Sequence, residues 1–239
     1  MKRLGVNIDH VATVRNARGS NHPDPLSIAK HVMECGAHSI TIHLREDRRH
    51  IKDLDVIKIC KNKKIITNLE ISLNEDVLKI ALKNKPNFIC IVPENRKEIT
   101  TEGGLNLSKN FNKIKIIIQK FKNKKIRTSL FIDPNLKDIK IAKELGADCV
   151  ELHTGRISDL IKGKKNYTNE YVKIKKCCEL AKNIKMEVHA GHGLDYKTTA
   201  ILSKLKKIEE FNIGHFIIGE SIVHGLKSTI KKFKKISNS

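Results

Sequence analysis

The sequence lacks the residues on which several protein classes depend. It has no tryptophan, and only 4% of its 239 residues are aromatic. Proteins that bind single-stranded nucleic acid use aromatic side chains as stacking platforms, so this scarcity argues against that class even though the net charge is +21. Much of the charge lies in lysine runs such as KICKNKK, which are typical of the solvent face of amphipathic helices. We therefore expect no nucleic-acid partner.

Signals for membranes, disulfides and domain linkers are also missing. The start MKRLGVNIDH has no apolar core of a signal peptide, and no apolar run reaches the roughly 18 residues that a membrane span needs. The six cysteines form no CxxC pair, which favours reduced thiols in a cytoplasmic protein with no membrane partner. No stretch rich in proline, glycine or serine divides the chain, so we expect a single domain over residues 1–239.

Short apolar runs of the buried-strand type recur along the chain, each followed by a longer amphipathic segment. The predicted strands are 4–8, 38–43, 65–70, 87–92, 126–132, 148–153, 185–190 and 213–218, and the predicted helices are 25–35, 52–61, 74–84, 108–123, 136–145, 167–183, 197–206 and 220–235. Eight such units predict an α/β fold, a (β/α)₈ TIM barrel, with an open doubly wound sheet as the alternative. The similarity of CGAHSITIHL (35–44) to LGADCVELHT (145–154) supports a duplicated half-barrel.

Ionisable residues gather where the predicted strands end. In a (β/α)₈ barrel these ends form the active site, so we predict an enzymatic pocket there. No lysine falls at a predicted strand end, which argues against Schiff-base chemistry. His189 and His192 could ligate a metal with Glu70 or His153, but they form no rigid helical pair, and we predict no metal. The strand-end residues are Asn7, Asp9, His10, His43, Arg45, Glu70, Glu94, Asp133, His153, His189, His192 and, on the eighth strand, Gly214 and His215.

Two regions of the predicted barrel mouth are suited to binding anions. HAGHGL after the seventh strand and IGHFIIGES through the eighth supply glycines whose N–H groups can approach a phosphate, with a helix expected to begin near Ser221. A second cluster, Arg45, Arg48, Arg49 and His50, follows the second strand, and arginine matches phosphate oxygens in a bidentate way. Two separate anion sites suggest two phosphate groups.

Six segments in order from residue 5 to about residue 225 resemble the pyridoxine 5'-phosphate synthase family: GVNIDHVATVRNARG, HLREDRRHI, TNLEIS, PENRKEITTEGG, AGHGLDY and NIGHFIIG. The resemblance implies condensation of 3-amino-2-oxopropyl phosphate with 1-deoxy-D-xylulose 5-phosphate to pyridoxine 5'-phosphate, phosphate and water. It also implies a barrel fold, no metal or organic cofactor, and a homo-octamer.

The resemblance assigns roles to particular residues. The acid-base residues fall on His43 and Glu70 as proton acceptors and His192 as proton donor. The contacts to the aminoketone phosphate fall on Asn7, Arg18, Gly193, Gly214 and His215, and those to deoxyxylulose phosphate on Asp9, His10, Arg45, His50 and Thr100.

Other residues have no direct role in this assignment. Arg48 and Arg49 are interpreted as support or surface, and His153 as a satisfied structural histidine. His189 departs from the Asn common in that family, so its role is open. The loop PENRKEITTEGG, with Gly103 and Gly104, is the candidate lid over reactive intermediates. The alternative functions are another phosphosugar barrel enzyme, such as an isomerase or a metal-dependent epimerase, and a basic nucleic-acid-binding protein.

Overall fold

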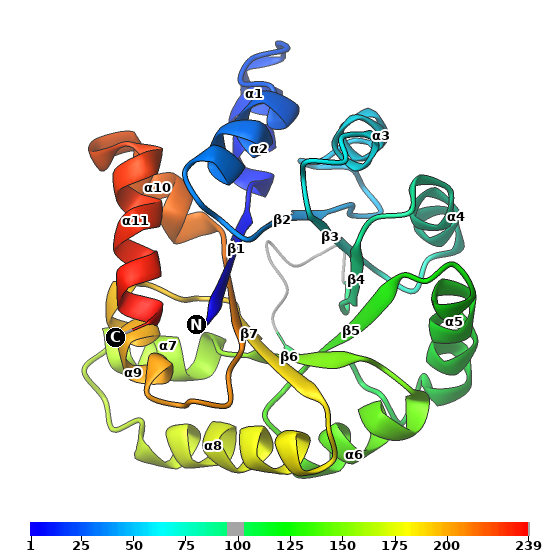
Figure 1. Ribbon diagram of the computed structural model, residues 1–239, viewed down its shortest axis with the longest axis vertical. Helices are drawn as coiled ribbons and strands as arrows, with labels where there is room; N and C mark the ends of the chain where they lie inside the picture. The colour runs from blue at the N-terminus through cyan, green and yellow to red at the C-terminus, as the bar shows by residue number, and fades with distance from the viewer. Residues whose placement is uncertain (95–102, 239) are drawn as a thin grey trace.

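Eight short segments rich in β-branched and apolar residues form a closed parallel barrel in the computed structural model, which describes residues 1–94 and 103–238 (Figure 1). The strands are β1 Arg3–Asn7, β2 Ser39–His43, β3 Thr67–Ile71, β4 Phe88–Ile91, β5 Arg127–Ile132, β6 Cys149–His153, β7 Glu187–Gly191 and β8 Glu210–Ile213. Each strand pairs with its neighbours in chain order, and β8 pairs with β1 to close the ring. The predicted (β/α)₈ barrel is confirmed.

Helices surround the barrel (Figure 1). Several helix ends carry residue types that favour them: the Asp24 side chain accepts a hydrogen bond from the Ser27 N–H at 3.0 Å, just before Pro25, and Gly146 ends a helix at φ +83°. No helix within the described residues is long and apolar enough to cross a bilayer. The helices are α1 Asp9–Arg18, α2 Pro25–Glu34, α3 Asp53–Lys61, α4 Glu75–Asn84, α5 Phe111–Asn123, α6 Leu136–Leu145, α7 Gly155–Lys162, α8 Thr168–Asn183, α9 Tyr196–Ser203, α10 His215–His224 and α11 Leu226–Ser237.

Successive residues of each strand face opposite sides of the barrel wall. Leu4, Val6, Ile40 and Ile42 face outward and are fully buried in an aliphatic core beneath the helices. The inward face instead carries many polar side chains, which meet one another across the barrel: Asn7, Thr41, His43, Asn68, Glu70, Glu151, His189, Glu210 and Asn212. The wall therefore separates an apolar layer, which stabilises the fold, from a polar interior.

The last strand and the helix after it differ from the prediction. Residues 213–218 were predicted as a strand, but the strand is Glu210–Ile213 and His215 already begins α10. The predicted helix 220–235 is two helices, because Gly225 at φ +75° separates α10 from α11. A short apolar run such as FIIGESIV fits a buried strand or a buried helix equally well, so its pattern alone could not decide.

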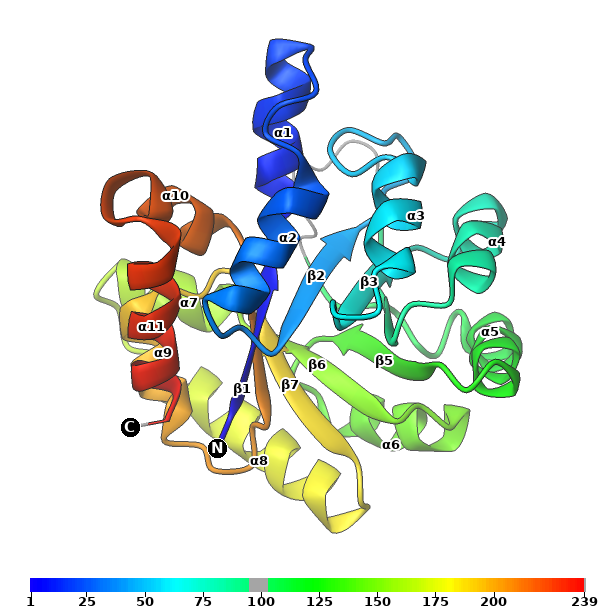
Figure 2. The same cartoon turned by 45° about the horizontal axis from the view of Figure 1, so that its top comes forward.

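Two helices that follow strands directly were not predicted. α1 begins two residues after β1, and α7 begins two residues after β6. Figure 2 shows α1 extending away from the strands, and the last residue of this helix, Arg18, is exposed.

Candidate active site

A cavity of about 470 Å³ lies at the carboxyl ends of the strands. Its size is in the range of small-molecule sites. It brings together most of the residues singled out from the sequence: Asn7, Asp9, His10, His43, Arg45, His50, Glu70, His192, Gly193, Gly214 and His215. The exposed Arg18 does not line it, and Thr100 lies outside the described residues, as does most of the candidate lid loop.

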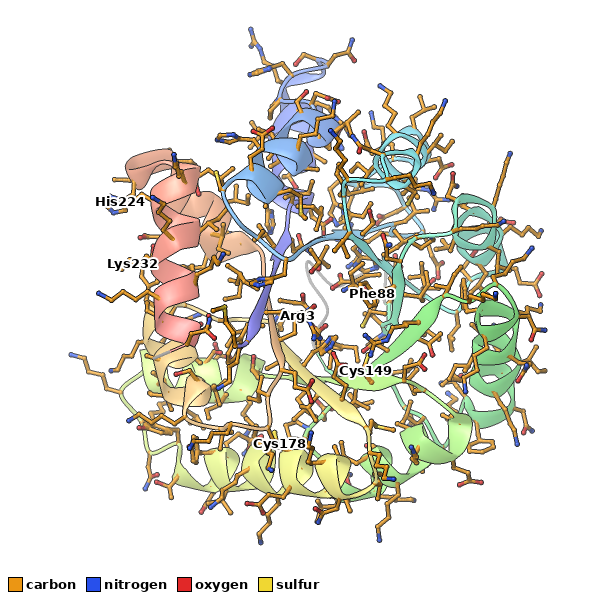
Figure 3. The ribbon with its side chains drawn as sticks, in the orientation of Figure 1. Arg3, Phe88, Cys149, Cys178, His224 and Lys232 are labelled. Carbon is orange, nitrogen blue, oxygen red and sulfur yellow. The ribbon has the colours of Figure 1, made fainter. Side chains whose placement is uncertain are left out.

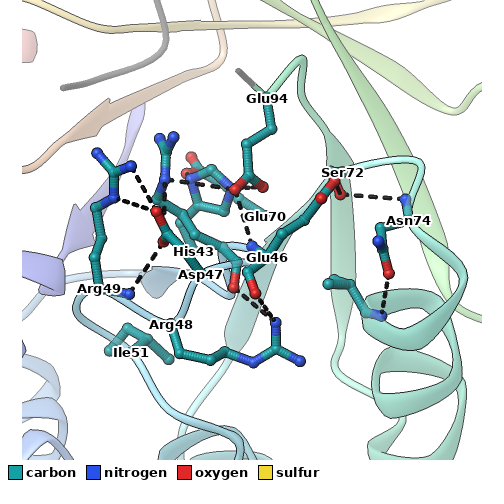
Figure 4. A network of polar contacts seen from close by, with 12 residues as sticks. His43, Glu46, Asp47, Arg48, Arg49, Ile51, Glu70, Ser72, Asn74 and Glu94 are labelled. Carbon is teal, nitrogen blue, oxygen red and sulfur yellow. Dashed lines mark hydrogen bonds and ion pairs between the residues drawn. The ribbon is translucent and has the colours of Figure 1, made fainter. Parts of the chain in front are cut away.

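His43 and Glu70 meet because β2 and β3 place them opposite each other in register. The His43 Nδ1 atom lies 3.7 Å from Glu70 Oε2, and the other ring nitrogen, Nε2, lies 3.7 Å from Glu94 Oε2 (Figure 4). Asp9 fixes the backbone here, since its carboxylate accepts a hydrogen bond from the His43 N–H at 2.8 Å. The result is an imidazole held between two carboxylates at the edge of the cavity.

The negative charge of an ionised Glu70 has little compensation from cations at this position. Burial raises its pKa well above the ordinary value, and the nearby carboxylates of Glu151 and Asp9 raise it further. A carboxyl group with a raised pKa is protonated more readily than an ordinary carboxylate, and its ionised form is a stronger base. That behaviour suits a group that exchanges protons with a substrate.

The three arginines of the loop after β2 have two different kinds of contact. Arg45 is only 3% exposed, lines the cavity, and places its Nε 3.6 Å from Glu94 Oε1. Arg48 turns back on the loop, donating to the Arg45 and Glu46 carbonyls at 2.8 and 3.0 Å and to Asp53 at 2.7 Å. Arg49 is held by Asp47 at 2.5 to 2.8 Å (Figure 4). Arg48 and Arg49 thus shape the loop that presents Arg45.

His192 sits on a turn with an uncommon backbone conformation. Its φ is +76°, in the left-handed region that non-glycine residues seldom adopt, and Gly193 follows at +74°. The Thr154 hydroxyl holds this turn, because it lies 2.7 Å from both the Gly191 and the His192 carbonyl oxygens. Burial, and then the neighbouring His153, lower the pKa of His192 to about 4. Without a bound anion, His192 is therefore a neutral imidazole at physiological pH.

The start of α10 faces the cavity. The cavity is lined by Gly214, His215 and Phe216. The sequence predicted that this helix begins near Ser221, but it begins at His215, next to the cavity. A side chain at Gly214 would come within 2.9 Å of the Asn7 Cβ, which explains the glycine. Backbone N–H groups at a helix start attract anions. The helix start that was predicted to bind phosphate therefore lies at the cavity.

Sequence reasoning missed Glu151 and Asn212, which also line the cavity. The Asn212 amide donates to Glu151 Oε2 at 2.7 Å, and Gly191 leaves the space, since a Cβ there would lie 1.9 Å from Glu151 Oε1. Burial raises the pKa of Glu151 to about 7, with His189 and then Asn212 acting against it. The available signal was a carboxylate in the middle of the buried strand DCVELH.

Lys162, which lies on the helix α7 that the sequence analysis did not predict, also lines the cavity.

Two histidines have different surroundings from those predicted. His153 was interpreted as a satisfied structural residue; its Nδ1 lies 3.0 Å from Asp133, but its buried Nε2 has no hydrogen-bond partner within the described residues. Its ring lies 4.9 Å from that of His192. His189 is not at the mouth of the barrel: it is a mid-strand residue whose Nε2 lies 2.8 Å from Glu187. The pair His189 and His192, considered for a metal, is therefore not brought together.

Another set of residues could hold a metal ion. Asp9, His43 and Glu70 offer ligand atoms that all lie within 4.8 Å of one another. One nitrogen and two carboxylate oxygens would suit a divalent cation. The same three residues surround the proposed site of proton transfer, so metal binding would compete with it.

Comparison with known proteins gives consistent matches. The family model "Pyridoxal phosphate biosynthesis protein PdxJ" matches residues 4–239. A pyridoxine 5'-phosphate synthase from Pelagibacter ubique is 77% identical over 238 residues, covering 100% of both chains, and one from Zymomonas mobilis is 46% identical, covering 99% of this chain and 92% of its own.

Among solved structures the similarity is one of fold. The Amycolatopsis orientalis BexX/CysO complex matches with a TM-score of 0.66 at 11% identity, covering 99% of this chain and 88% of that one. Phosphoribosylanthranilate isomerase from Thermotoga maritima matches with a TM-score of 0.58 at 12% identity, covering 99% and 98%. At these identities the matches support the barrel and say nothing of its chemistry.

Proposed function

The chain belongs to the PdxJ family of pyridoxal phosphate biosynthesis proteins, and from that premise we propose how its pocket catalyses the pyridoxine 5'-phosphate synthase reaction. In this reaction 3-amino-2-oxopropyl phosphate condenses with 1-deoxy-D-xylulose 5-phosphate to give pyridoxine 5'-phosphate, inorganic phosphate and water. The observation that carries the proposal is the His43–Glu70 pair, set in register at the mouth of a cavity that is also lined by two groups of residues suited to binding anions.

The proton transfers fall to His43, Glu70 and His192. Amine addition, dehydration, loss of phosphate and ring closure each need a proton removed or supplied, and a positioned acid or base accelerates such a step by roughly 10²- to 10⁴-fold. His43 and Glu70 accept protons on one side of the cavity. His192 donates from the other side, and a bound phosphate dianion would raise its lowered pKa toward the working range.

Two phosphate sites position the substrates. Gly193 and the start of α10 at Gly214 and His215 offer the site for the aminoketone phosphate, together with Asn7. Arg45, with His10, His50 and Asp9, offers the site for deoxyxylulose phosphate. The assignment of Arg18 and Thr100 to these sites stays a prediction.

The experiment that tests the proposal is direct. The purified protein is mixed with both substrates, and pyridoxine 5'-phosphate is followed by absorbance and mass, with each substrate omitted in turn as control. Product that requires both substrates supports the proposal, and no product with both present contradicts it.

A metal-dependent phosphosugar epimerase is the second candidate, because Asp9, His43 and Glu70 could hold an ion. Metal analysis of the purified protein and assays with a chelator separate the two. Loss of activity on chelation, restored by a divalent cation, would favour the epimerase type of site.

The oligomeric state and the location are further parts of the proposal. We propose a homo-octamer in the cytoplasm. α1 packs against α10, and on these two helices Val14, Ile222 and Val223 are 54%, 82% and 75% exposed, which offers an apolar surface to another copy. The six cysteines are free and buried, which suits a reducing compartment. Light scattering should give eight times the 27.1 kDa chain mass.

A further inference from the structure

Charged side chains fill the amino-terminal end of the barrel, away from the pocket. Arg3 pairs with Glu187, and its Nε donates to Glu210 at 2.6 Å. Arg127 reaches the other oxygen of Glu187 at 2.9 Å. Figure 3 shows the Arg3 side chain among those inside the strand ring. These four residues, with His189, form what we call the amino-end network.

His189 lies at the top of the amino-end network. It is 5% exposed, its Nε2 is 2.8 Å from Glu187 Oε1, and its Nδ1 is 3.8 Å from Glu210 Oε1. Burial alone would lower the pKa of His189, yet Glu210, Glu187 and Glu151 together raise it above the ordinary value. The imidazole is therefore more readily protonated than a free histidine.

His189 is also the register neighbour of Glu151. β6 and β7 pair these two residues, and adjacent strands lie about 4.8 Å apart. Both side chains point into the barrel, but only Glu151 lines the active-site cavity. His189 thus lies one step below the cavity, between the amino-end network and a carboxylate of the site.

The charges of the network do not balance without Glu151. When His189 is protonated, three cations, His189, Arg3 and Arg127, face the two carboxylates Glu187 and Glu210 in these ion pairs, and the Arg3 guanidinium lies 3.3 Å from His189 Nε2. The excess positive charge faces Glu151, whose carboxylate would compensate it. Unbalanced buried charge is costly, so protonation of His189 favours ionisation of Glu151.

We propose that His189 is a positioning residue for the reaction: from inside the barrel it supplies the positive charge that keeps the Glu151 carboxylate ionised beneath the substrates. The proposal rests on the proposed function, in which amine addition to a ketone passes through a positively charged, protonated imine. An ionised carboxylate below the cavity stabilises such an intermediate, whereas a neutral carboxyl group does not.

Other ionisable groups also act on Glu151. Across the barrel, Glu70 and the buried thiol of Cys90 interact with it unfavourably, and Glu210 raises its pKa, whereas His153 lowers it. His189 is the largest of the charged influences that favour the ionised form. Removing His189 should therefore leave Glu151 among groups that mostly favour its neutral form.

The test is an infrared titration of the intact protein without substrate. The carbonyl band of protonated Glu151 is assigned as the band lost in Glu151→Gln, and its intensity is followed with pH. In His189→Asn the midpoint should rise by roughly one to two pH units, as expected for loss of a unit charge about 5 Å away. His189→Gln provides a second neutral replacement if the first does not fold.

Arg127→Gln is the matched control. It removes a cation from the same network, at a side chain that is 40% exposed and bonds to Glu187 and not to Glu151. It should lower the melting temperature and shift the Glu151 midpoint much less than His189→Asn does, because solvent partly screens the charge of Arg127. An unchanged midpoint in a folded His189 variant, or an equal rise in Arg127→Gln, would overturn the proposal.

A rate measurement connects the inference to catalysis. The pH at which kcat/KM reaches half its maximum should rise in His189→Asn by the same amount as the infrared midpoint. If the wild-type protein forms no pyridoxine 5'-phosphate, the proposed function fails, while the infrared comparison still decides the role of His189.

Discussion

Glu187 and Glu70 lie at opposite ends of the same barrel interior, and they differ in their partners. Glu187 contacts Arg3, Arg127 and His189. The hydrogen bond from His189, with the two arginines, holds its pKa well below the usual range despite burial. Within residues 1–94 and 103–238, the only ion-pair partner of Glu70 is the His43 imidazole at 3.7 Å; burial, and then the carboxylates of Glu151 and Asp9, raise its pKa.

The difference separates structural carboxylates from reactive ones. A fully paired carboxylate stays ionised, stabilises the fold and is a weak base. A buried carboxylate without a strong cation costs stability but can exchange a proton at neutral pH. In this protein Glu187 at the amino-terminal end of the barrel is of the first kind and Glu70 at the carboxyl end is of the second, with Glu151 and His189 between them.

The largest expected effect tests the reactive end. Glu70→Gln removes the base without changing the shape of the side chain, so turnover should fall by about 10² or more. Stability should be unchanged or higher, because a carboxyl whose pKa is raised in the folded state disfavours folding above its unfolded pKa. Steady-state kinetics and thermal melting of the same sample measure both, and near-normal turnover would remove Glu70 from the mechanism.

His192→Asn tests the opposite wall of the cavity. If His192 donates the proton for a late elimination, both substrates should still bind and form their first imine, and the reaction should then stall with a drop in product formation of about 10². Single-turnover mass spectrometry should detect the accumulated intermediate. His224→Asn, at a 56% exposed histidine, is the control. Product at the wild-type single-turnover rate would rule out the donor role.

Glu187→Gln tests the structural end. At pH 7 the variant should lose about 2 kcal/mol of unfolding free energy, since Arg3 and Arg127 lose a charged partner and His189 a hydrogen-bond acceptor in a mostly buried site. The folded pKa of Glu187 is depressed, so its stabilisation is present above the unfolded value of about 4.3 and is lost as the pH falls further.

The stability difference from the wild type should therefore shrink in acid. Denaturant unfolding at several pH values measures it, with the exposed Glu144→Gln as control. An equal difference at pH 7 and pH 3 would mean that the ion pairs are not the cause.

The fold could be predicted wherever the apolar, outward-facing residues made up most of a strand's sequence. Seven strands carry enough apolar residues to be recognised, whereas β8 reads EFNI, because its inward residues Glu210 and Asn212 belong to the polar interior. The apolar run just after it was taken for the strand instead.

The site was predictable where residues cluster next to a strand end. His43, Arg45, His50 and Glu70 were found because short segments place them there. Glu151 was missed, since its role depends on Gly191 and Asn212, which lie 40 and 61 residues away in the chain. The amino-end network was missed for the same reason: Arg3 and Glu187 are 184 residues apart, and no local pattern reports their pairing.

The smallest expected effect concerns Arg45, whose setting combines both ends of the comparison. Like Glu187 it is buried beside opposite charges, Glu94 at 3.6 Å and Asp47 at 4.0 Å, yet like Glu70 it faces the cavity.

Arg45→Lys keeps the charge and loses the planar fork. If Arg45 binds the deoxyxylulose phosphate in a bidentate way, KM for that substrate should rise about tenfold, the effect of losing one good hydrogen bond to a charged group. KM for the aminoketone phosphate should change little, because its proposed site is at the start of α10. Arg49→Lys is the matched control, since Arg49 bonds to Asp47 on the same loop. A loss of stability with no change in KM would place Arg45 with the structural charges.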